Sequence, residues 1–372
     1  MKKRVQQFGL ESIAAKIDDQ LRIHEEEALQ LFECGDLQLL GFLANKVNQR
    51  KNGNRASYIF NRYINYSNLC ILSCQFCSFY RRKNQPGAFE FSVEEVVADA
   101  KASYDQGACE VHIVGGLHPK LPFSYYLEMI QGIKKECPGM FVKAFTAVEI
   151  RHLADRIARI SLAETLQTLK NNGLDSLTGG GAEIFDPVIR DQICRGKESA
   201  EEWLEVHRLW HQIGGKSTCT MLYGHLETVA HRVDHLKRLR ALQDETHGFT
   251  GFIPFAFEPE NNQLSDLKRT TAFDDLRTLA ISRIYLDNFD HITAYWISLG
   301  LPLAQIALSY GVDDLHGTIE VERIFHMAGS QTPQAQTHLR LEKAIREAGK
   351  TPFARNTWYE PLQSTLSQCV TP

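Results

Sequence analysis

Apolar and polar positions recur in two different patterns along this chain, and the pattern changes near residue 57. In residues 1–57 the apolar positions have helical spacing, with one group around the polar run at 24–27 and a second group at 37–47. This spacing predicts amphipathic helices. We expect residues 1–57 to form an N-terminal helical cap that packs on the main domain.

From residue 58 onward, short apolar runs alternate with amphipathic stretches, which is the pattern of parallel βαβ units. The expected strands are 62–66, 110–114, 142–145, 176–177, 217–222, 252–255 and the less regular 291–296, and the expected helices are 93–104, 125–135, 161–171, 200–213, 230–244 and 271–285. Six or more such units form a full or partial (β/α) barrel of the TIM type, with its chemistry at the C-terminal ends of the strands. We expect this α/β core at 58–309 and a barrel-closing segment with a helical tail at 310–372.

Cap residues mark the ends of several expected helices. Capping boxes at residues 92–95 and 161–164 place Ser before a helix and Glu three residues later. Gly107, Gly173 and Gly214 each follow a helix, where a C-terminal cap needs a residue without a side chain.

The composition, with 43% hydrophobic and 23% charged residues, is that of an ordinary globular enzyme. The net charge of −4 and the lack of a basic block argue against nucleic acid as a partner. The chain has no apolar run of about 18 residues, so we expect no membrane span. The basic N-terminus has no apolar run behind it, so we expect no secretory signal, and nine cysteines without one favour the reducing cytoplasm.

Three of the cysteines, Cys70, Cys74 and Cys77, form a CxxxCxxC motif directly after the first expected barrel strand. They are one ligand short of a structural zinc site, whereas a [4Fe–4S] cube held by three cysteines leaves one iron open to a small molecule. The alternatives are a disulfide with a spare thiol, inert buried thiols, and a zinc site completed by His112 or His118. The spacing favours the iron–sulfur site.

A CxxxCxxC motif with an aromatic residue, Phe76, before the last cysteine resembles the signature of radical S-adenosylmethionine (radical SAM) enzymes. The resemblance implies that SAM binds the open iron and that a glycine-rich end of the second strand receives its amino group. Gly115 and Gly116 match that position. A simple turn is the alternative reading of this glycine pair.

Polar residues also follow the third and fourth barrel strands. Thr146 is a candidate contact to ribose or carboxylate, while Glu149 is equally a helix-starting carboxylate. Glu183 follows three glycines and can accept hydrogen bonds from ribose hydroxyls or an amine, with a flexible loop as the alternative. The candidate cofactor contacts are therefore Phe76, Gly115, Gly116, Thr146 and Glu183.

Longer segments indicate which family of radical SAM enzymes the chain resembles. Residues 111–119, 143–150, 179–185, 203–208, 221–225, 231–235 and 322–329 are similar to those of aminofutalosine synthases, although Thr178 stands where proline is expected. The resemblance implies a step of menaquinone biosynthesis by the futalosine route. The SAM-derived 5′-deoxyadenosyl radical adds to the double bond of 3-[(1-carboxyvinyl)oxy]benzoate, and aryl migration and decarboxylation give 6-amino-6-deoxyfutalosine. SAM is then a consumed co-substrate.

That substrate has two carboxylates, which are costly to bury without donors or cations. The candidates, chosen by their position near strand ends, are His118, Lys143, His225, Arg323 and His326. The resemblance also implies a low-potential electron donor such as flavodoxin or ferredoxin. The competing interpretations are dehypoxanthine futalosine cyclase, the deazaflavin-precursor synthases and a non-catalytic protein that binds an iron–sulfur cluster or SAM.

Overall fold

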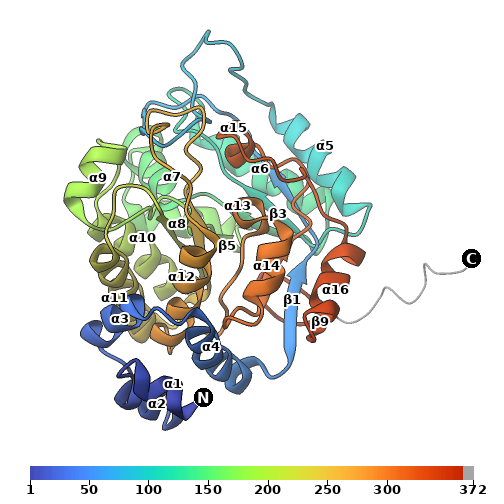
Figure 1. The fold of residues 1–372 in the computed structure, drawn as a ribbon. Coiled ribbons are helices and arrows are strands. Elements are labelled where there is room, and N and C mark those ends of the chain that lie inside the picture. Colours follow the sequence, from blue (N-terminus) through green and yellow to red (C-terminus); the bar gives the residue numbers. More distant parts are fainter. Residues whose placement is uncertain (363–372) are drawn as a thin grey trace, which may run out of the picture.

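Two parallel sheets surround the centre of the molecule. The structure is a computed structural model and describes residues 1–362 (Figure 1). The six-stranded sheet runs in chain order through β2 (Asn61–Ile64), β3 (Glu110–Ile113), β4 (Phe141–Ala144), β5 (Ser176–Leu177), β6 (Lys216–Tyr223) and β7 (Phe249–Ala256). A three-stranded sheet has the order β8 (Asp314–Gly317), β1 (Arg55–Ile59) and β9 (Thr351–Arg355). These parallel strands confirm the predicted (β/α) barrel architecture.

The expected strand at 291–296 is reduced to two isolated bridges, which join the sheets. Ile292 pairs with Phe252 of β7, and Thr293 pairs with Asp314 of β8. On the opposite side, the Tyr63 N–H of β2 donates to the Ile319 carbonyl at 2.8 Å. Strand and bridge contacts therefore run from β2 round to the segment after β8.

Six helices of the barrel lie close to the predicted ranges, because their end signals are local in the sequence. They are α5 (Val93–Tyr104), α6 (Phe123–Glu136), α8 (Leu162–Asn171), α10 (Ala200–Gln212), α11 (Val229–Thr246) and α12 (Ala272–Tyr285). The sequence analysis did not predict α7 (Ala147–His152), α9 (Pro187–Cys194) or the π-helical turn at Leu153–Ala158. Later come α13 (Trp296–Leu299), α14 (Leu301–Ala307), α15 (Ile324–Met327) and α16 (His338–Glu347).

The cap residues explain this agreement. Ser92 and Glu95 form both bonds of the predicted capping box, whereas Ser161 caps α8 through its hydroxyl alone. Gly107, Gly173 and Gly214 adopt the left-handed conformation, with φ of 98°, 104° and 78°, which only glycine enters without strain.

The N-terminal segment forms α1 (Lys2–Gln7), α2 (Glu11–Asp18), α3 (Glu25–Glu33) and α4 (Leu37–Asn52). Helices α3 and α4 pack on α11 and α12, at the lower end of the molecule in Figure 1. Within residues 1–362, no helix is long and apolar enough to cross a membrane.

Candidate active site

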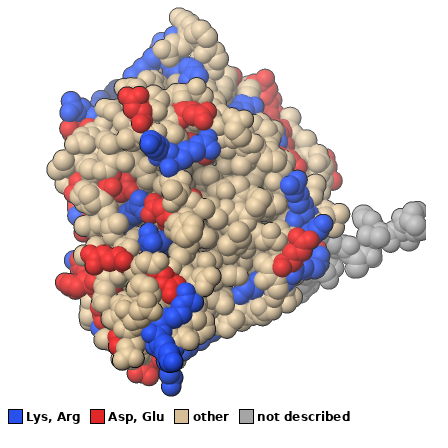
Figure 2. Space-filling view, in the orientation of Figure 1, with Lys and Arg blue, Asp and Glu red and all other residues tan. Residues whose placement is uncertain are grey.

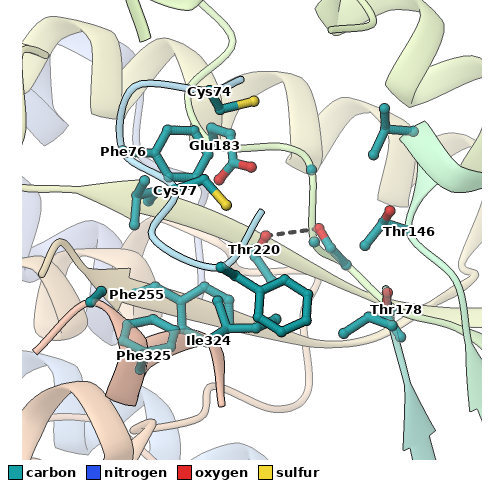
Figure 3. A pocket seen from close by; sticks show the side chains of 18 of the residues that line it. Cys74, Phe76, Cys77, Thr146, Thr178, Glu183, Thr220, Phe255, Ile324 and Phe325 are labelled. Atoms are coloured by element: carbon teal, nitrogen blue, oxygen red, sulfur yellow. Dashed lines mark hydrogen bonds between the residues drawn. The ribbon is translucent and has the colours of Figure 1, made fainter. Parts of the chain in front are cut away.

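A cavity of about 260 Å³ lies inside the barrel and extends to the C-terminal ends of its strands. Figure 3 shows Cys74, Phe76, Cys77 and Glu183 together at one end of it, with Phe255, Ile324 and Phe325 below them. Among the described residues, none that lines the cavity belongs to the N-terminal helices α1 to α4. The cavity is therefore built by the barrel and the C-terminal segment.

The cysteine loop, residues 70–77, is tied to the glycine pair that follows β3. The Ile71 N–H donates to the Leu117 carbonyl at 3.0 Å, and the Leu117 N–H lies 3.4 Å from Cys70 Sγ. A Cβ on Gly116 would lie 2.4 Å from the Leu69 carbonyl oxygen, closer than real atoms approach. Gly116 is thus required by the contact between the two loops.

Cys70, Cys74 and Cys77 all line the cavity. Burial raises the pKa of the Cys74 and Cys77 thiols, so an isolated thiolate is costly at either position. A bound cationic metal centre removes that cost, because it ligates thiolates directly. The donor set of three thiols on one cavity wall therefore fits an iron–sulfur cluster. In the described residues, no group of three or more His, Cys, Asp or Glu side chains is arranged to hold a single metal ion.

Glu149 connects the glycine pair to the start of α7. Its buried carboxylate accepts from the Gly115 N–H at 3.0 Å and from the Tyr66 hydroxyl at 2.8 Å. Thr146 is the N-cap of α7, and its hydroxyl donates to the same carboxylate at 2.8 Å. Burial raises the pKa of Glu149, although these donors oppose the shift. The predicted helix-starting role of Glu149 is confirmed, and Thr146 also lines the cavity.

Glu183 lies beside the cysteine loop with its backbone in the left-handed region, at a φ of 46°. Its carboxylate pairs with Lys197 Nζ at 2.5 Å, and Lys197 lies 5.7 Å from the centre of the Phe76 ring. Both members of the pair are largely buried. Burial lowers the pKa of Lys197, but the charges of Glu183 and Glu198 outweigh it and raise the pKa overall. Lys197 stays protonated in the cavity wall.

Two of the glycines before Glu183 are required by the protein's own packing. A Cβ on Gly179 would lie 2.5 Å from Cys219 Cα of β6, and a Cβ on Gly180 would lie 2.9 Å from Thr146 Cγ2. The Gly179 carbonyl also accepts from the Thr220 hydroxyl at 2.7 Å, the bond drawn in Figure 3.

The inner half of the cavity has an aromatic wall and a polar floor. Phe255 and Tyr295 are 4.9 Å apart between ring centres, and Phe325 lies 5.4 Å from Tyr295. Tyr63 and His316 also line the cavity, each one residue before the C-terminal end of its strand. The wall suits a flat apolar ring.

The C-terminal segment closes this half through α15. Glu322 accepts from the backbone N–H groups of Ile324, Phe325 and His326 at 2.8 to 3.2 Å. The His326 ring lies 3.0 Å from the Glu322 carboxylate and 2.8 Å from the Thr332 carbonyl. Glu322, Ile324 and Phe325 line the cavity, so these hydrogen bonds position part of its wall. We call the hydrogen-bonded segment 322–332 the α15 knot.

The structure brings the predicted cofactor contacts together and places the predicted substrate contacts elsewhere. Phe76, Gly115, Gly116, Thr146 and Glu183 all line the cavity, together with the three cysteines. The residues His118, Lys143, His225, Arg323 and His326 do not line it.

Each of these five side chains has another environment. His118 faces Glu90 in a separate surface groove, and Lys143 lies buried in β4. The His225 ring lies 3.0 Å from the Leu222 carbonyl and also contacts Glu227. Arg323 stacks on Phe89 and Phe91, and His326 holds the α15 knot. Position near a strand end did not indicate which way a side chain points.

The cavity also contains residues that the sequence analysis did not select as site residues. They include Tyr63, His112, Lys197, Thr218, Thr220, Tyr295, His316 and Glu322. Two of them, Thr218 and Thr220, lie at alternate positions of β6. Polar residues at every second position of a buried strand face the same side, so this alternation could have indicated that they line the cavity. Lys197 has no such signal, because it meets Glu183 only through the fold.

Comparison with known proteins agrees with this geometry. The family model of the radical SAM superfamily matches residues 64–239, and the model of the CofH/MqnC C-terminal region matches residues 246–368. The crystal structure of methylornithine synthase has the same fold, with a TM-score of 0.73 and 17% identity, over 91% of this chain and 96% of that one. Radical SAM enzymes use a [4Fe–4S] cluster and SAM, which confirms the predicted cofactors.

Two curated relatives are similar over nearly the whole chain. The aminodeoxyfutalosine synthase of Thermus thermophilus is 47% identical, over 94% of this chain and 95% of its own length. The cyclic dehypoxanthine futalosine synthase of Streptomyces coelicolor is 37% identical, over 92% of this chain and 86% of its own. The chain therefore belongs to the radical SAM superfamily and, within it, to the family of the aminodeoxyfutalosine synthases.

Proposed function

We propose that this protein is an aminodeoxyfutalosine synthase that joins the 5′-deoxyadenosyl group of SAM to 3-[(1-carboxyvinyl)oxy]benzoate and forms 6-amino-6-deoxyfutalosine. The observation that carries the proposal is the 47% identity to the Thermus synthase along almost the entire chain. The identity to the named cyclase is lower, at 37%. The cavity supports the same proposal, because its three-thiol end adjoins an aromatic wall.

We assign the cofactor positions as part of this proposal. Cys70, Cys74 and Cys77 ligate the cluster, and the five predicted contacts Phe76, Gly115, Gly116, Thr146 and Glu183 hold SAM. Their common position on the wall of one cavity supports the assignment. When bound, the cluster and SAM supply a 5′-deoxyadenosyl radical for addition to the alkene.

The chain's own residues hold the reactants and exclude water. Glu149 fixes the Gly115 backbone, and Lys197 neutralises Glu183 where the nucleoside binds. Phe255, Tyr295 and Phe325 provide an apolar wall for the aryl ring. A closed apolar site protects a reactive intermediate from solvent and fixes the distance between the reacting carbons.

The test is anaerobic turnover followed by mass spectrometry. The reconstituted and reduced protein is incubated with SAM and 3-[(1-carboxyvinyl)oxy]benzoate. An adenosyl–benzoate adduct that has lost one carboxylate supports the proposal. If this substrate gives no adduct, while dehypoxanthine futalosine causes release of 5′-deoxyadenosine, the protein is the cyclase instead.

We also propose that an acidic, low-potential protein such as flavodoxin or ferredoxin delivers the electron at a basic groove next to the cluster. The groove is lined by Arg81, Arg82, Lys83 and Lys120, with Glu90 as its acidic residue, and Cys70 belongs to both this groove and the cavity. Four cations on a chain of net charge −4 favour an acidic partner. The described cysteines are all free thiols, which supports a reducing, cytoplasmic setting.

A further inference from the structure

Three polar rings meet in the cavity wall, each one residue before the C-terminal end of its strand. The rings of Tyr63 and His112 stack at 4.3 Å, in register on β2 and β3. The Tyr63 hydroxyl lies 3.1 Å from His316 Nε2 of β8. We call Tyr63, His112 and His316 the histidine floor.

The depth of the floor follows from its place in the strands. His112 precedes Gly115 by three residues, which sets it roughly 10 Å deeper along the barrel at the rise of an extended chain. A ligand that reaches both the cofactor end and the floor must therefore span the aromatic wall. A substituted aromatic ring with polar groups at both ends has that shape.

The floor has unused hydrogen-bonding capacity. Nδ1 of His112 and Nδ1 of His316 are both buried and have no hydrogen-bond partner among the described residues. Buried polar atoms are nearly always paired, so such atoms in a cavity wall call for a ligand or water. His316 also holds a left-handed backbone conformation, with φ of 63°, an uncommon conformation that is often found at functional sites.

Four other polar groups of the cavity have partners within the chain. The Thr178 hydroxyl donates to the Phe145 carbonyl at 2.9 Å, and the Thr220 hydroxyl donates to Gly179. The Glu183 carboxylate pairs with Lys197, and the Glu322 carboxylate accepts the backbone of α15. The two histidines of the floor thus differ from these four groups, because each keeps a ring nitrogen without a partner among the described residues.

The histidine floor offers neutral hydrogen-bond donors among buried charges of both signs. Burial lowers the pKa of His316 to about 3 and holds that of His112 well below its usual value, so both rings are neutral donors in the free protein. Lys143 is paired in register with His112, and its positive charge acts on both histidines. The Asp314 carboxylate also acts on His316, and Arg355 pairs with that carboxylate at 2.7 Å. The buried Lys143 thus supports an anion at the floor without lining the cavity.

Building on the proposed function, we propose that the histidine floor binds the ring carboxylate of the substrate. The ligand class is a meta-substituted benzoate whose enol-ether end lies at the cofactor. This arrangement places the two carboxylates at opposite ends of the aromatic wall and keeps the alkene next to SAM. His112 and His316 are then specificity-determining residues.

The test compares two ligands that differ only in the ring carboxylate. Equilibrium dialysis of the anaerobic holoenzyme with SAM measures the binding of 3-[(1-carboxyvinyl)oxy]benzoate and of 2-phenoxyacrylate, which lacks that group. The wild-type protein should prefer the benzoate by about 10- to 100-fold, the range for hydrogen bonds to a charged group. His112→Phe keeps the stacking on Tyr63 and should abolish most of this preference, as should His316→Asn.

The matched control is His338→Phe, which changes a histidine beside the Phe60 ring outside the cavity. It should keep the wild-type preference. Iron content and SAM binding equal to those of the wild type show that each variant is folded and holds its cofactors. Equal binding of both ligands by the wild type, or an unchanged preference in folded His112→Phe, overturns the proposal. If the wild type prefers the benzoate but forms no adduct in the turnover assay, the proposed function is refuted. The proposal that the histidine floor binds the ring carboxylate then still stands.

Discussion

At the residue scale, Gly116 determines how closely the cysteine loop approaches the end of β3. Gly116→Ala places a Cβ against the Leu69 carbonyl oxygen, a backbone atom that cannot move without the loop. We expect iron content after anaerobic reconstitution to fall several-fold, because the Cys70 thiol must shift with its neighbours. Steric insertions into well-packed regions cost about 1–3 kcal/mol, so the fold should survive.

Gly35→Ala is the control for this prediction. Neither glycine has a positive φ, and a Cβ on Gly35 would meet only Phe8 Cε1 at 3.8 Å, an ordinary contact. Iron and sulfide analysis with thermal unfolding measures both variants. Full cluster loading in Gly116→Ala would mean that the Leu69 contact does not fix the loop.

The sequence was informative at individual residues where the chemistry depends on local spacing. Cys70, Cys74, Cys77 and the Gly115–Gly116 pair are close together in the chain or follow a strand directly, and all of them line the cavity. His112 and His316 are separated by more than half of the chain and meet only through the pairing of β2 with β3 and the return of β8. No local sequence pattern could predict that His112 and His316 lie close together.

At the element scale, the same distinction separates the helices from the second sheet. The bounds of α5 were predicted correctly, because Ser92 and Glu95 satisfy its first turn from within the sequence. Strand β1 was not predicted as a separate strand, since its partners β8 and β9 lie more than 250 residues later. The weak strand at 291–296 forms only single bridges, which a hydrophobic pattern cannot distinguish from a full strand.

The α15 knot should respond to pH through His326. The hydrogen bond and charge of Glu322 raise the pKa of His326 above its usual 6.5, because both ring nitrogens face acceptors. Because the pKa of His326 is raised in the folded protein, protonated His326 stabilises the α15 knot fully below pH 6.5. This stabilisation is lost as the pH rises through the folded-state pKa. Amide hydrogen exchange of residues 322–330 should therefore lose roughly tenfold of its protection toward pH 8.5, after correction for intrinsic rates.

His326→Gln is the comparison for the knot. Glutamine can still donate to the Thr332 carbonyl but carries no titrating charge, so its protection should be lower at pH 6 and nearly constant with pH. Peptides from α12 supply the internal reference within each protein. Parallel pH profiles in wild type and His326→Gln would exclude His326 as the titrating group.

At the scale of the whole molecule, the two ends of the chain have different positions relative to the chemistry. The N-terminal helices pack on α11 and α12, and Arg22 joins them to Asp244 and Asp287 by bonds of 2.6 to 3.0 Å. The C-terminal segment instead supplies β8, the α15 knot and part of the cavity wall. Closure of the site therefore depends on residues 314–328, and the N-terminal segment supports the barrel from outside.

The surface charge of the molecule leads to the last prediction. Charges of both signs are interspersed over the face in Figure 2, and Lys and Arg atoms also lie at its upper edge, where the loop of residues 80–90 protrudes in Figure 1. Lys83 and Lys120 are exposed members of the basic groove beside Cys70. The double variant Lys83→Glu/Lys120→Glu should raise the KM for reduced flavodoxin roughly 3- to 10-fold at low salt.

Turnover driven by dithionite should be unchanged in this variant, because a small reductant needs no docking surface. The double variant Lys135→Glu/Lys343→Glu, at two exposed positions outside the groove, makes the same change in charge and should leave the KM for flavodoxin unaffected. Added salt should weaken the wild-type interaction and reduce the difference between wild type and variant, since screening acts on exposed charges. An equal loss with dithionite would assign the effect to cluster damage, and no loss with either reductant would move the docking site elsewhere.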